Sequence, residues 1–368
     1  MGACAGTLVV FCLCMGAALG QQAEPSLDVL SVEEWERVDD SVDRALEWLA
    51  DQQQRDGSFP TLPTGQPGVT SLAVTAFLSA GHLPGEGIYG EQLNRAIDFA
   101  LDCQREDGLF SQLQVNAVYQ HNGASHAAHY NHAITGVMLG EVYGMCHGER
   151  QQKVRSAIER ALVYMRDMQN KPKADGAEQG GWRYYSSQNQ SDLSVTAWQI
   201  MFMRSAKNAQ FDVPAEHVDE ATAYVKRCFD PAQKTFLYRR TKPEEFLSRG
   251  VVASGILVLS LSGDHNSPLA TQSGDWLLGQ SFREYNQGVG PYHYGAYYAS
   301  QATFQLGGKY WRHCYPEIAQ TLTKSQGPDG AWDIEQNYNG GAFGRCYTTA
   351  LATLALTTPY QLLPIYQR

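Results

Sequence analysis

One carboxylate, Asp192 in the stretch QSDLSVTAW, is the first candidate for a catalytic group in this sequence. A carboxyl group can act as a general acid when its surroundings tune its pKa. No further carboxylate stands beside Asp192 in this stretch. An Asp at this place also suits the N-cap of a helix, with Ser191 as a rival. We therefore keep two hypotheses for Asp192, a general acid and a helix cap.

Four histidines lie close together in the sequence: His121, His126, His129 and His132. A spacing of three residues can place two imidazoles near one metal ion, and His293 could approach from another segment. No carboxylate or cysteine stands at ligand spacing, so a metal site at His126, His129 and His132 is the weaker hypothesis. The alternative is that these histidines line a cavity rim or cap helices. His132 is also a candidate catalytic residue, and we predict no cofactor.

Aromatic residues gather at the starts of several apolar segments: Tyr130, Trp198, Tyr292, Tyr294, Tyr297, Tyr298 and Tyr347. Aromatic faces can stabilise a cationic intermediate, although aromatic side chains also simply fill a large core. The predicted substrate-binding residues are Tyr130, Trp198, Arg249, His293, Tyr294, Tyr297, Gln301, Arg345 and Tyr347. The tyrosine hydroxyls and Gln301 indicate a cavity that is partly polar.

These groups must be positioned by helices. Val42, Ala45, Leu46 and Leu49 recur at the spacing of one helix face, and similar periodicity precedes residues 104 and 326. Between these amphipathic segments lie six almost uncharged segments that are rich in small residues, at 68–81, 129–144, 191–206, 248–263, 293–308 and 345–358. A helix that is apolar on most sides is buried on most sides. The sequence therefore predicts six helical hairpins that close into an outer and an inner ring, an all-α, α6/α6 toroid.

A short motif ends three of the amphipathic segments: QQRDGSF from Gln53, QREDGLF from Gln104 and SQGPDGAW with Gln326. The Gln side chain can satisfy backbone groups at a helix end. Asp-Gly supplies a turn in which glycine takes positive φ, and the aromatic residue can pack on the neighbouring hairpin. We predict that the motif joins repeats and specifies architecture, not chemistry.

Composition limits the partners and the location of the protein. The 368 residues are 43% hydrophobic and carry a net charge of -10, which argues against nucleic acid as a partner. Residues 1–20 are uncharged and end in Ala18-Leu19-Gly20, which predicts a signal peptide and export to the periplasm or outside the cell. No later segment is apolar enough to span a membrane. The five cysteines after residue 20 are scattered and predict no disulfide framework.

The Gln-x-x-Asp-Gly-x-Phe/Trp motif resembles the QW repeat of the squalene-cyclase and protein prenyltransferase superfamily, the terpenoid cyclase toroids. The stretches YNHAITGVMLGEVYGM, SVTAWQ and YYASQATFQLGGKYW are similar to secreted bacterial prenyltransferase and squalene oxidase repeat proteins of unassigned reaction. The resemblance covers residues 39–368, with 21–38 as an N-terminal extension. It implies an α6/α6 toroid with a central apolar cavity.

The chain departs from this superfamily at its catalytic motifs. Squalene-hopene cyclases carry Asp-x-Asp-Asp, of which only Asp192 has a counterpart here. The Asp, Cys and His zinc ligands of prenyltransferases have no match at the starts of the last two inner segments, where Arg345 and Cys346 stand instead of His. The Gly-Cys-Gly-Glu-Gln string of thioester proteins is missing.

These observations lead to one principal hypothesis and two alternatives. The principal hypothesis is a terpenoid-cyclase-like or prenyltransferase-like protein that binds or cyclises an isoprenoid or other apolar lipid, with Asp192 as the acid if it is an enzyme. The first alternative is a non-catalytic envelope scaffold or binding module with a protein partner. The second is a carbohydrate-active (α/α)6 enzyme, which needs two carboxylates. Beyond Asp192, the turns offer Asp175, Glu178, Glu244 and Glu245.

Overall fold

The computed structural model describes residues 28–113, 127–243, 247–265, 267–285, 290–335 and 342–367. Outside these ranges lie the predicted signal peptide, His121, His126, Glu244 and Glu245. Within them the chain forms twelve α-helices and one short hairpin of β1 (Phe229–Asp230) and β2 (Thr235–Phe236). The all-α prediction is confirmed.

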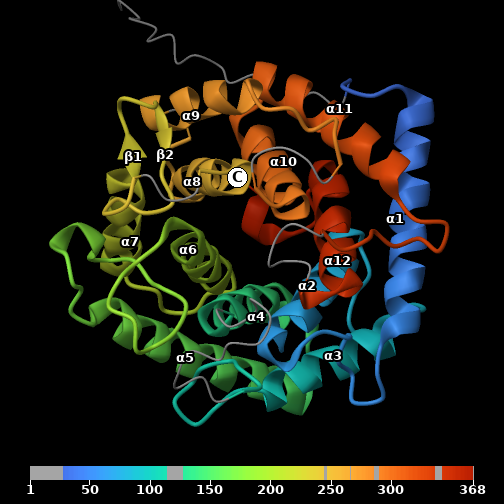
Figure 1. The fold of residues 1–368 in the computed structure, drawn as a ribbon. Coiled ribbons are helices and arrows are strands. Elements are labelled where there is room, and N and C mark those ends of the chain that lie inside the picture. The colour runs from blue at the N-terminus through green and yellow to red at the C-terminus, as the bar shows by residue number, and fades with distance from the viewer. Residues whose placement is uncertain are drawn as a thin grey trace, which may run out of the picture.

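Six helices form an outer ring and six form an inner ring (Figure 1). The outer helices are α1 (Val32–Gln52), α3 (Gly90–Asp102), α5 (Gly148–Asn170), α7 (Ala215–Arg227), α9 (Pro268–Leu278) and α11 (Gly308–Ser325). The inner helices are α2 (Gly68–Ser79), α4 (Ala128–Val142), α6 (Leu193–Asn208), α8 (Arg249–Leu261), α10 (Tyr292–Leu306) and α12 (Arg345–Leu356). Outer and inner helices alternate along the chain, as the sequence predicted.

The two rings differ in burial because they differ in composition. Every residue of α2 is buried, and α4 buries all but Tyr130. The outer helix α1 buries one face, with Val42, Ala45, Leu46 and Leu49, and exposes its acidic face to water. No helix of the described residues combines the length and the apolar character needed to cross a membrane.

The inner ring closes on itself. Each inner helix packs against the next, from α2 through α4, α6, α8 and α10 to α12, and α12 packs against α2. In this order α4 lies opposite α10, and α6 lies opposite α12. The first and last outer helices also meet, since α1 contacts α11. The predicted α6/α6 toroid is therefore the fold of the protein.

Helix α1 begins earlier than the sequence boundary at residue 39. A capping box fixes its start, because Ser31 accepts a hydrogen bond from the Glu34 amide and Glu34 accepts one from the Ser31 amide. Trp35 then stacks on Tyr315 of α11, with ring centroids 5.7 Å apart. Part of the segment 21–38, predicted as an extension, thus belongs to the toroid.

The Gln-Asp-Gly motif joins consecutive repeats through the glutamine amide. Gln53 donates to the Gly57 carbonyl at 3.0 Å and to the Gln92 carbonyl of the next outer helix at 2.8 Å. Gln104, Gln169 and Gln326 repeat this arrangement toward α5, α7 and α1. The following glycine has positive φ at each turn, +91° at Gly57. The predicted role of the motif is confirmed, and the bonds reach the next outer helix as well as the local turn.

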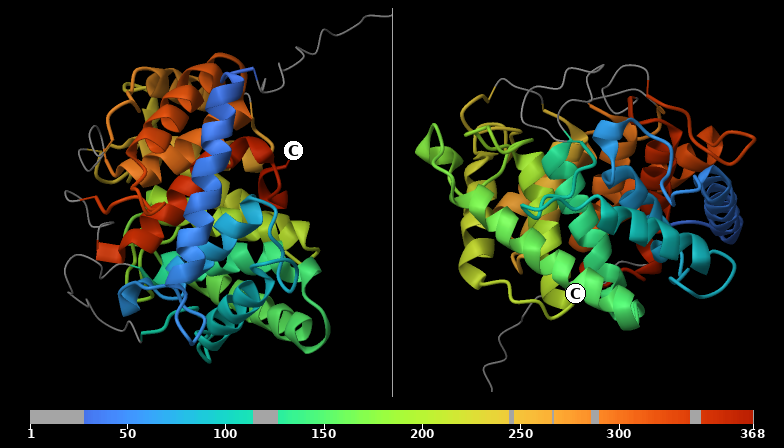
Figure 2. Two further views of the ribbon diagram at one scale, coloured as in Figure 1. Left: turned by 90° about the vertical axis from the view of Figure 1, so that its right-hand side faces the viewer. Right: turned by 90° about the horizontal axis from the view of Figure 1, so that it is seen from below.

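The C-terminal segment crosses the axis of the ring. After α12 the chain forms two short helices, η5 (Thr358–Tyr360) and η6 (Pro364–Tyr366). The Ile365 amide donates to Glu141 of α4, and Gln305 of α10 donates to the Tyr366 carbonyl. Since α4 and α10 lie opposite each other, a segment bonded to both lies across the ring. We call residues 361–367 the C-terminal plug, and Figure 2 shows the C-terminus at one face of the ring.

Candidate functional site: an aromatic mouth

Three tyrosines occupy the same place in three inner helices. Tyr130, Tyr294 and Tyr347 are each the third residue of their helix, in α4, α10 and α12, and each is half-buried. The three rings therefore lie at the N-terminal ends of the inner helices, where Gly250 of α8 is beside Tyr294 and Gly68 of α2 is beside Asn131 of α4. All three were predicted from the sequence as substrate-binding residues.

Two further aromatic rings lie beside these tyrosines. Tyr184, from the loop before α6, lies 6.1 Å from the Tyr130 ring. Phe343, just before α12, lies 5.6 Å from the Tyr347 ring. We define the aromatic mouth as Tyr130, Tyr184, Tyr294, Phe343 and Tyr347. Because each of these rings is only partly buried, the mouth offers apolar faces to a ligand.

A glycine in α8 positions one of these rings. A Cβ atom placed on Gly250 would lie 2.4 Å from Cδ1 of Tyr294. No residue with a side chain therefore fits at Gly250 while the tyrosine holds this position. The glycine provides the flat surface on which the Tyr294 ring rests.

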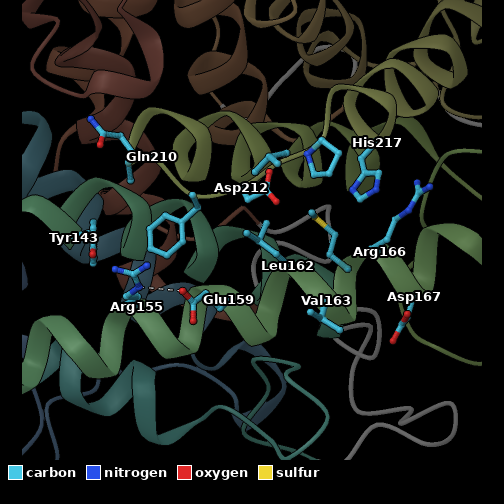
Figure 3. A pocket seen from close by; sticks show the side chains of 15 residues that line it. Tyr143, Arg155, Glu159, Leu162, Val163, Arg166, Asp167, Gln210, Asp212 and His217 are labelled. Atoms are coloured by element: carbon cyan, nitrogen blue, oxygen red, sulfur yellow. Dashed lines mark hydrogen bonds and ion pairs between the residues drawn. The ribbon is translucent and has the colours of Figure 1, made fainter.

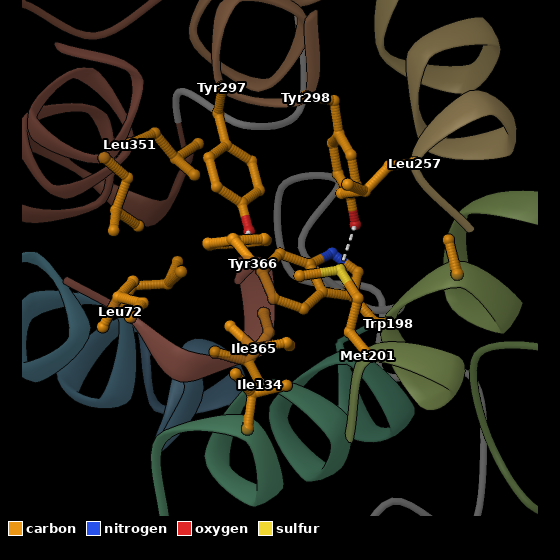
Figure 4. Close-up of a cluster of buried hydrophobic side chains, with 14 of the residues drawn as sticks. Leu72, Ile134, Trp198, Met201, Leu257, Tyr297, Tyr298, Leu351, Ile365 and Tyr366 are labelled. Atoms are coloured by element: carbon orange, nitrogen blue, oxygen red, sulfur yellow. Dashed lines mark hydrogen bonds between the residues drawn. The ribbon is translucent and has the colours of Figure 1, made fainter. Parts of the chain in front are cut away.

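A second aromatic layer closes the ring below the mouth. Trp198 of α6 stacks on Tyr297 of α10 at 5.8 Å and meets Tyr298 edge-on at the same separation. Since α8 separates α6 from α10, these contacts run through the interior of the ring (Figure 4). Tyr297 also hydrogen-bonds Tyr366 of the plug. The predicted residues Trp198 and Tyr297 are thus brought together in the interior.

A buried polar atom without a hydrogen-bond partner points to a polar component of the interior. Gln301 Oε1 is buried and has no hydrogen-bond partner in the part of the chain that the structure describes. Gln301 follows Tyr297 by four residues and therefore lies on the same side of α10. Buried polar atoms normally have partners. The interior thus suits a ligand that is mainly apolar and carries a hydroxyl or a similar group.

Asp192 is the N-cap of α6. Its Oδ1 accepts from the Val195 amide at 2.9 Å, and its Oδ2 accepts from Arg183 Nη1 at 2.8 Å. The predicted helix cap is confirmed. Burial raises the pKa of the Asp192 carboxyl, and the Arg183 guanidinium opposes this rise. Asp192 lies near the mouth, because its partner Arg183 is also in contact with the ring of Tyr184.

Arg183 connects Asp192 to the mouth. Its guanidinium lies 4.0 Å from the centre of the Tyr184 ring and donates to the Tyr238 hydroxyl at 2.7 Å. The hydroxyls of Tyr184 and Tyr238 are hydrogen-bonded to each other. Nothing in the sequence pointed to Arg183, Tyr184 or Tyr238 as site residues. Arg183 and Tyr184 stand in the stretch GGWRYY, which follows the helical segment ending near Gln169.

A second buried carboxylate lies on the other side of the mouth. Glu335 accepts from the amides of Tyr292 and His293 and from His293 Nδ1, the last at 2.6 Å. His293 Nε2 hydrogen-bonds the Tyr285 hydroxyl at 3.1 Å. His293 is therefore held at the start of α10 beside the mouth, and its ring is fully buried. Glu335 was not identified from the sequence, because nothing in the WDIEQ stretch indicates its distant partner.

The described histidines of the predicted metal cluster face the outer ring. His129 hydrogen-bonds the Arg183 carbonyl through Nδ1 and the Tyr164 hydroxyl through Nε2. His132 Nδ1 accepts from the Phe110 amide at 3.3 Å. Burial lowers the pKa of His129 to about 4 and that of His132 to about 3, so both rings are neutral. His132 thus packs between the rings and not at the mouth, and His129 has both ring nitrogens in use.

The two predicted arginines are engaged in contacts with the protein itself. Arg249 donates to the Ser281 carbonyl at 2.6 Å and lies over the Phe282 ring. Arg345 forms two hydrogen bonds with Asp329, each of 2.8 Å, and its guanidinium lies over the ring of Trp48 in α1. Both side chains connect an inner helix to neighbouring loops or to the outer ring. The structure therefore gives them contacts that stabilise the architecture.

A separate groove of about 680 Å³ lies on the outer surface between α5 and the α6–α7 loop (Figure 3). Two of its charged groups form ion pairs, Arg155 with Glu159 at 3.0 Å and Arg166 with Glu220 at 2.7 Å. Tyr143 and Phe211 pack together within it, with ring centroids 4.9 Å apart. The groove shares no residue with the aromatic mouth.

Comparisons with known proteins agree with this architecture. No family model matches the chain. Over 185 residues, half of this chain, the sequence is 25% identical to drimenyl diphosphate synthase from Streptomyces showdoensis. That match covers 30% of the relative, so the chain spans about a third of the length of the curated protein it matches.

Solved structures show the same fold at low sequence identity. A type II terpene cyclase from Scytonema without ligand aligns with 91% of this chain and 100% of its own, at 14% identity and a TM-score of 0.56. The same cyclase in complex with geranylgeranyl dihydroxybenzoate gives a TM-score of 0.53 at 13% identity, over 90% of this chain and 99% of its own. A glycosidase gives 0.58 at 11% identity, over 91% and 100%. The chain shares the α/α toroid with both kinds of enzyme.

Proposed function

We propose that this terpenoid-cyclase-type toroid binds an isoprenoid or another apolar lipid in its aromatic mouth. The observation that carries the proposal is the equivalent position of Tyr130, Tyr294 and Tyr347 at the N-terminal ends of three inner helices. Half-buried aromatic faces gathered at one end of a ring suit a flexible apolar chain. A type II terpene cyclase of similar fold, in complex with geranylgeranyl dihydroxybenzoate, supports the proposal.

The charges near the mouth favour an uncharged ligand. Asp192 forms an ion pair with Arg183, and Glu335 accepts hydrogen bonds from His293 and from two backbone amides. Because each buried charge is already compensated by a partner, a charged ligand would have to displace an existing pair. The tyrosine hydroxyls leave room for a ligand with one polar end. An isoprenoid alcohol or a hydrocarbon meets these conditions.

The catalytic part of the proposal is an acid-initiated cyclisation with Asp192 as the proton donor. In this step the carboxyl gives its proton to a double bond, a neighbouring double bond attacks the carbocation, and loss of a proton ends the reaction. The product is an isomer of unchanged mass. Burial of Asp192 favours the protonated form, whereas Arg183 favours the carboxylate. Cyclisation therefore requires that ligand binding weakens the contact between Arg183 and Asp192.

The experiment compares lipid binding with lipid conversion. The protein is incubated with farnesol, geranylgeraniol or squalene, separated from free lipid, and its organic extract is analysed by mass spectrometry. We expect retained lipid in the wild type and clear loss in Tyr294→Ala. Tyr143→Ala is the matched control, because Tyr143 is also half-buried but lies in the outer groove. A new isomer that disappears in Asp192→Asn would assign catalysis to this residue.

The remaining outcomes distinguish the alternatives. Asp175→Asn controls for the substitution of a capping aspartate, since Asp175 accepts from the Ala177 amide in an exposed loop. Lipid that is retained but unchanged would identify a carrier. No retention of any lipid would reject the proposal and favour the scaffold or the carbohydrate-active enzyme. Export through the predicted signal peptide remains part of the proposal, tested by N-terminal sequencing of protein secreted from an expression host.

A further inference from the structure

The C-terminal plug fills the part of the ring below the aromatic layer. Ile365 is fully buried and Tyr366 is 4% exposed, and both pack in the cluster that contains Trp198 and Tyr297 (Figure 4). Leu362 of the same segment is 48% exposed. The plug thus buries Leu363, Ile365 and Tyr366, whereas Leu362 and Gln367 are exposed.

Side chains from the inner helices hold the plug in place. Gln305 of α10 donates to the Tyr366 carbonyl at 2.7 Å, and Asn208 of α6 donates to the Pro364 carbonyl at 3.1 Å. Glu141 of α4 accepts from the Ile365 amide at 3.3 Å. Backbone groups of an irregular buried segment need such partners. Three inner helices provide them, so the plug is an integral part of the ring.

The plug makes the site shallow. Tyr297 hydrogen-bonds Tyr366 of the plug. The mouth residue Tyr294 lies three residues before Tyr297 in α10. With a helical rise of about 1.5 Å per residue, the two levels are separated by roughly 4.5 Å along the helix. A ligand that enters at the mouth therefore meets the aromatic layer and the plug after about one helical turn.

We propose that Ile365 and Tyr366 set the depth of the lipid site and restrict it to short isoprenoids. This inference rests on the proposed function. A long chain such as squalene, with six isoprene units, needs depth that the plug occupies, whereas farnesol, with three, can fold against the mouth. Removing the Tyr366 side chain deletes both its volume and its bond to Tyr297, and so opens the interior toward the far face.

The test measures retention of farnesol, geranylgeraniol and squalene by the full chain, separately and in competition. We expect the wild type to prefer farnesol over squalene by at least about tenfold. Tyr366→Ala should raise the ratio of retained squalene to retained farnesol by a similar factor, and Ile365→Ala should raise this ratio less. Tyr366→Phe keeps the volume and should keep the preference. Leu362→Ala is the matched control, since Leu362 lies in the plug but at the surface.

The outcomes separate this inference from the proposed function. If the wild type retains no lipid, the proposed function fails and the inference fails with it. If the wild type retains squalene as well as farnesol, or if all variants show the same preference, lipid binding stands and the role of the plug is rejected. Should Tyr366→Ala not fold, as judged by circular dichroism, Tyr366→Leu keeps an apolar side chain of smaller volume and must shift the preference in the same direction.

Discussion

The Gln326 side-chain amide donates a hydrogen bond of 2.8 Å to the Ser41 carbonyl and so joins the last outer helix to the first. The two residues are 285 positions apart in the sequence. The same bond in the other copies joins neighbouring repeats, so at Gln326 the motif closes the ring. This single type of contact therefore specifies both the repeat and its closure.

We expect Gln326→Ala to lower the free energy of unfolding by about 1–3 kcal/mol, because it removes the two hydrogen bonds that the Gln326 amide donates to the Ser41 and Gly330 carbonyls. The measurement is urea unfolding followed by circular dichroism. Gln320→Ala is the control, since Gln320 bridges α11 to Glu34 of α1 at an exposed position. Surface contacts of this kind contribute little. Equal effects of the two substitutions would show that closure does not depend on the buried amide.

We expect Gly250→Ala to weaken lipid binding through Tyr294. A Cβ atom at Gly250 must displace the Tyr294 ring, which forms part of the mouth. Gly255→Ala is the control on the same helix, because its Cβ atom would meet Phe236 at 2.5 Å, away from the mouth. Both variants should lose stability, by roughly 1–3 kcal/mol for an overpacked site. Only Gly250→Ala should also reduce retention of farnesol, and equal retention by both variants would contradict this role of Tyr294.

We expect acid to destabilise the protein through His129 and His132. Their pKa values fall to about 4 and about 3 in the folded protein, because burial disfavours the charged ring. Histidine in the unfolded chain titrates near 6.5, so this stability is present above about pH 6.5 and is lost as the pH falls toward the folded values. The free energy of unfolding, measured at a series of pH values, should fall less steeply in His132→Asn than in the wild type. Parallel profiles would show that His132 is not a buried neutral ring.

We expect Glu141, which contacts the plug, to lower the stability of the protein as the pH rises, opposite to the effect of the two histidines. Burial raises its pKa to about 7, although Ser205 and the Ile365 amide donate hydrogen bonds to the carboxylate. The carboxyl of the folded protein is thus protonated more readily than in the unfolded chain, and its contribution to stability is lost as the pH rises toward 7. The free energy of unfolding of Glu141→Gln, relative to that of the wild type, should therefore increase between about pH 4.5 and 7, by up to about 3 kcal/mol. A constant difference would contradict the raised pKa.

The fold was predictable because its determinants are local. The Gln-Asp-Gly motif and the almost uncharged inner segments stand in the sequence at regular intervals, and each inner helix ends within two residues of its predicted range. Tyr130, Tyr294 and Tyr347 were predictable for the same reason, since the first turn of an inner helix must lie at an end of the ring. Their common position follows from the repeat.

The rest of the site depends on contacts between distant segments. Arg249 is the first residue of α8, yet its side chain extends to Ser281, because the start of α8 lies beside the loop that precedes α10. The pair of Glu335 with His293 and the pair of Tyr366 with Tyr297 join residues 42 and 69 positions apart. No local pattern identifies such partners. Their positions follow only when the ring closes.

Ring closure also changes how the repeats depend on one another. In an open array of helical pairs, the two end repeats each have one uncovered apolar face and need capping sequences. Here α1 and α12 are covered by each other, so no repeat is terminal. One helical pair can unfold only when its interfaces with both neighbouring pairs break, and this exposes two apolar faces at once. The toroid should therefore unfold as one cooperative unit and not from its ends, and partial proteolysis should yield intact ring or small peptides, without stable fragments of two or three repeats.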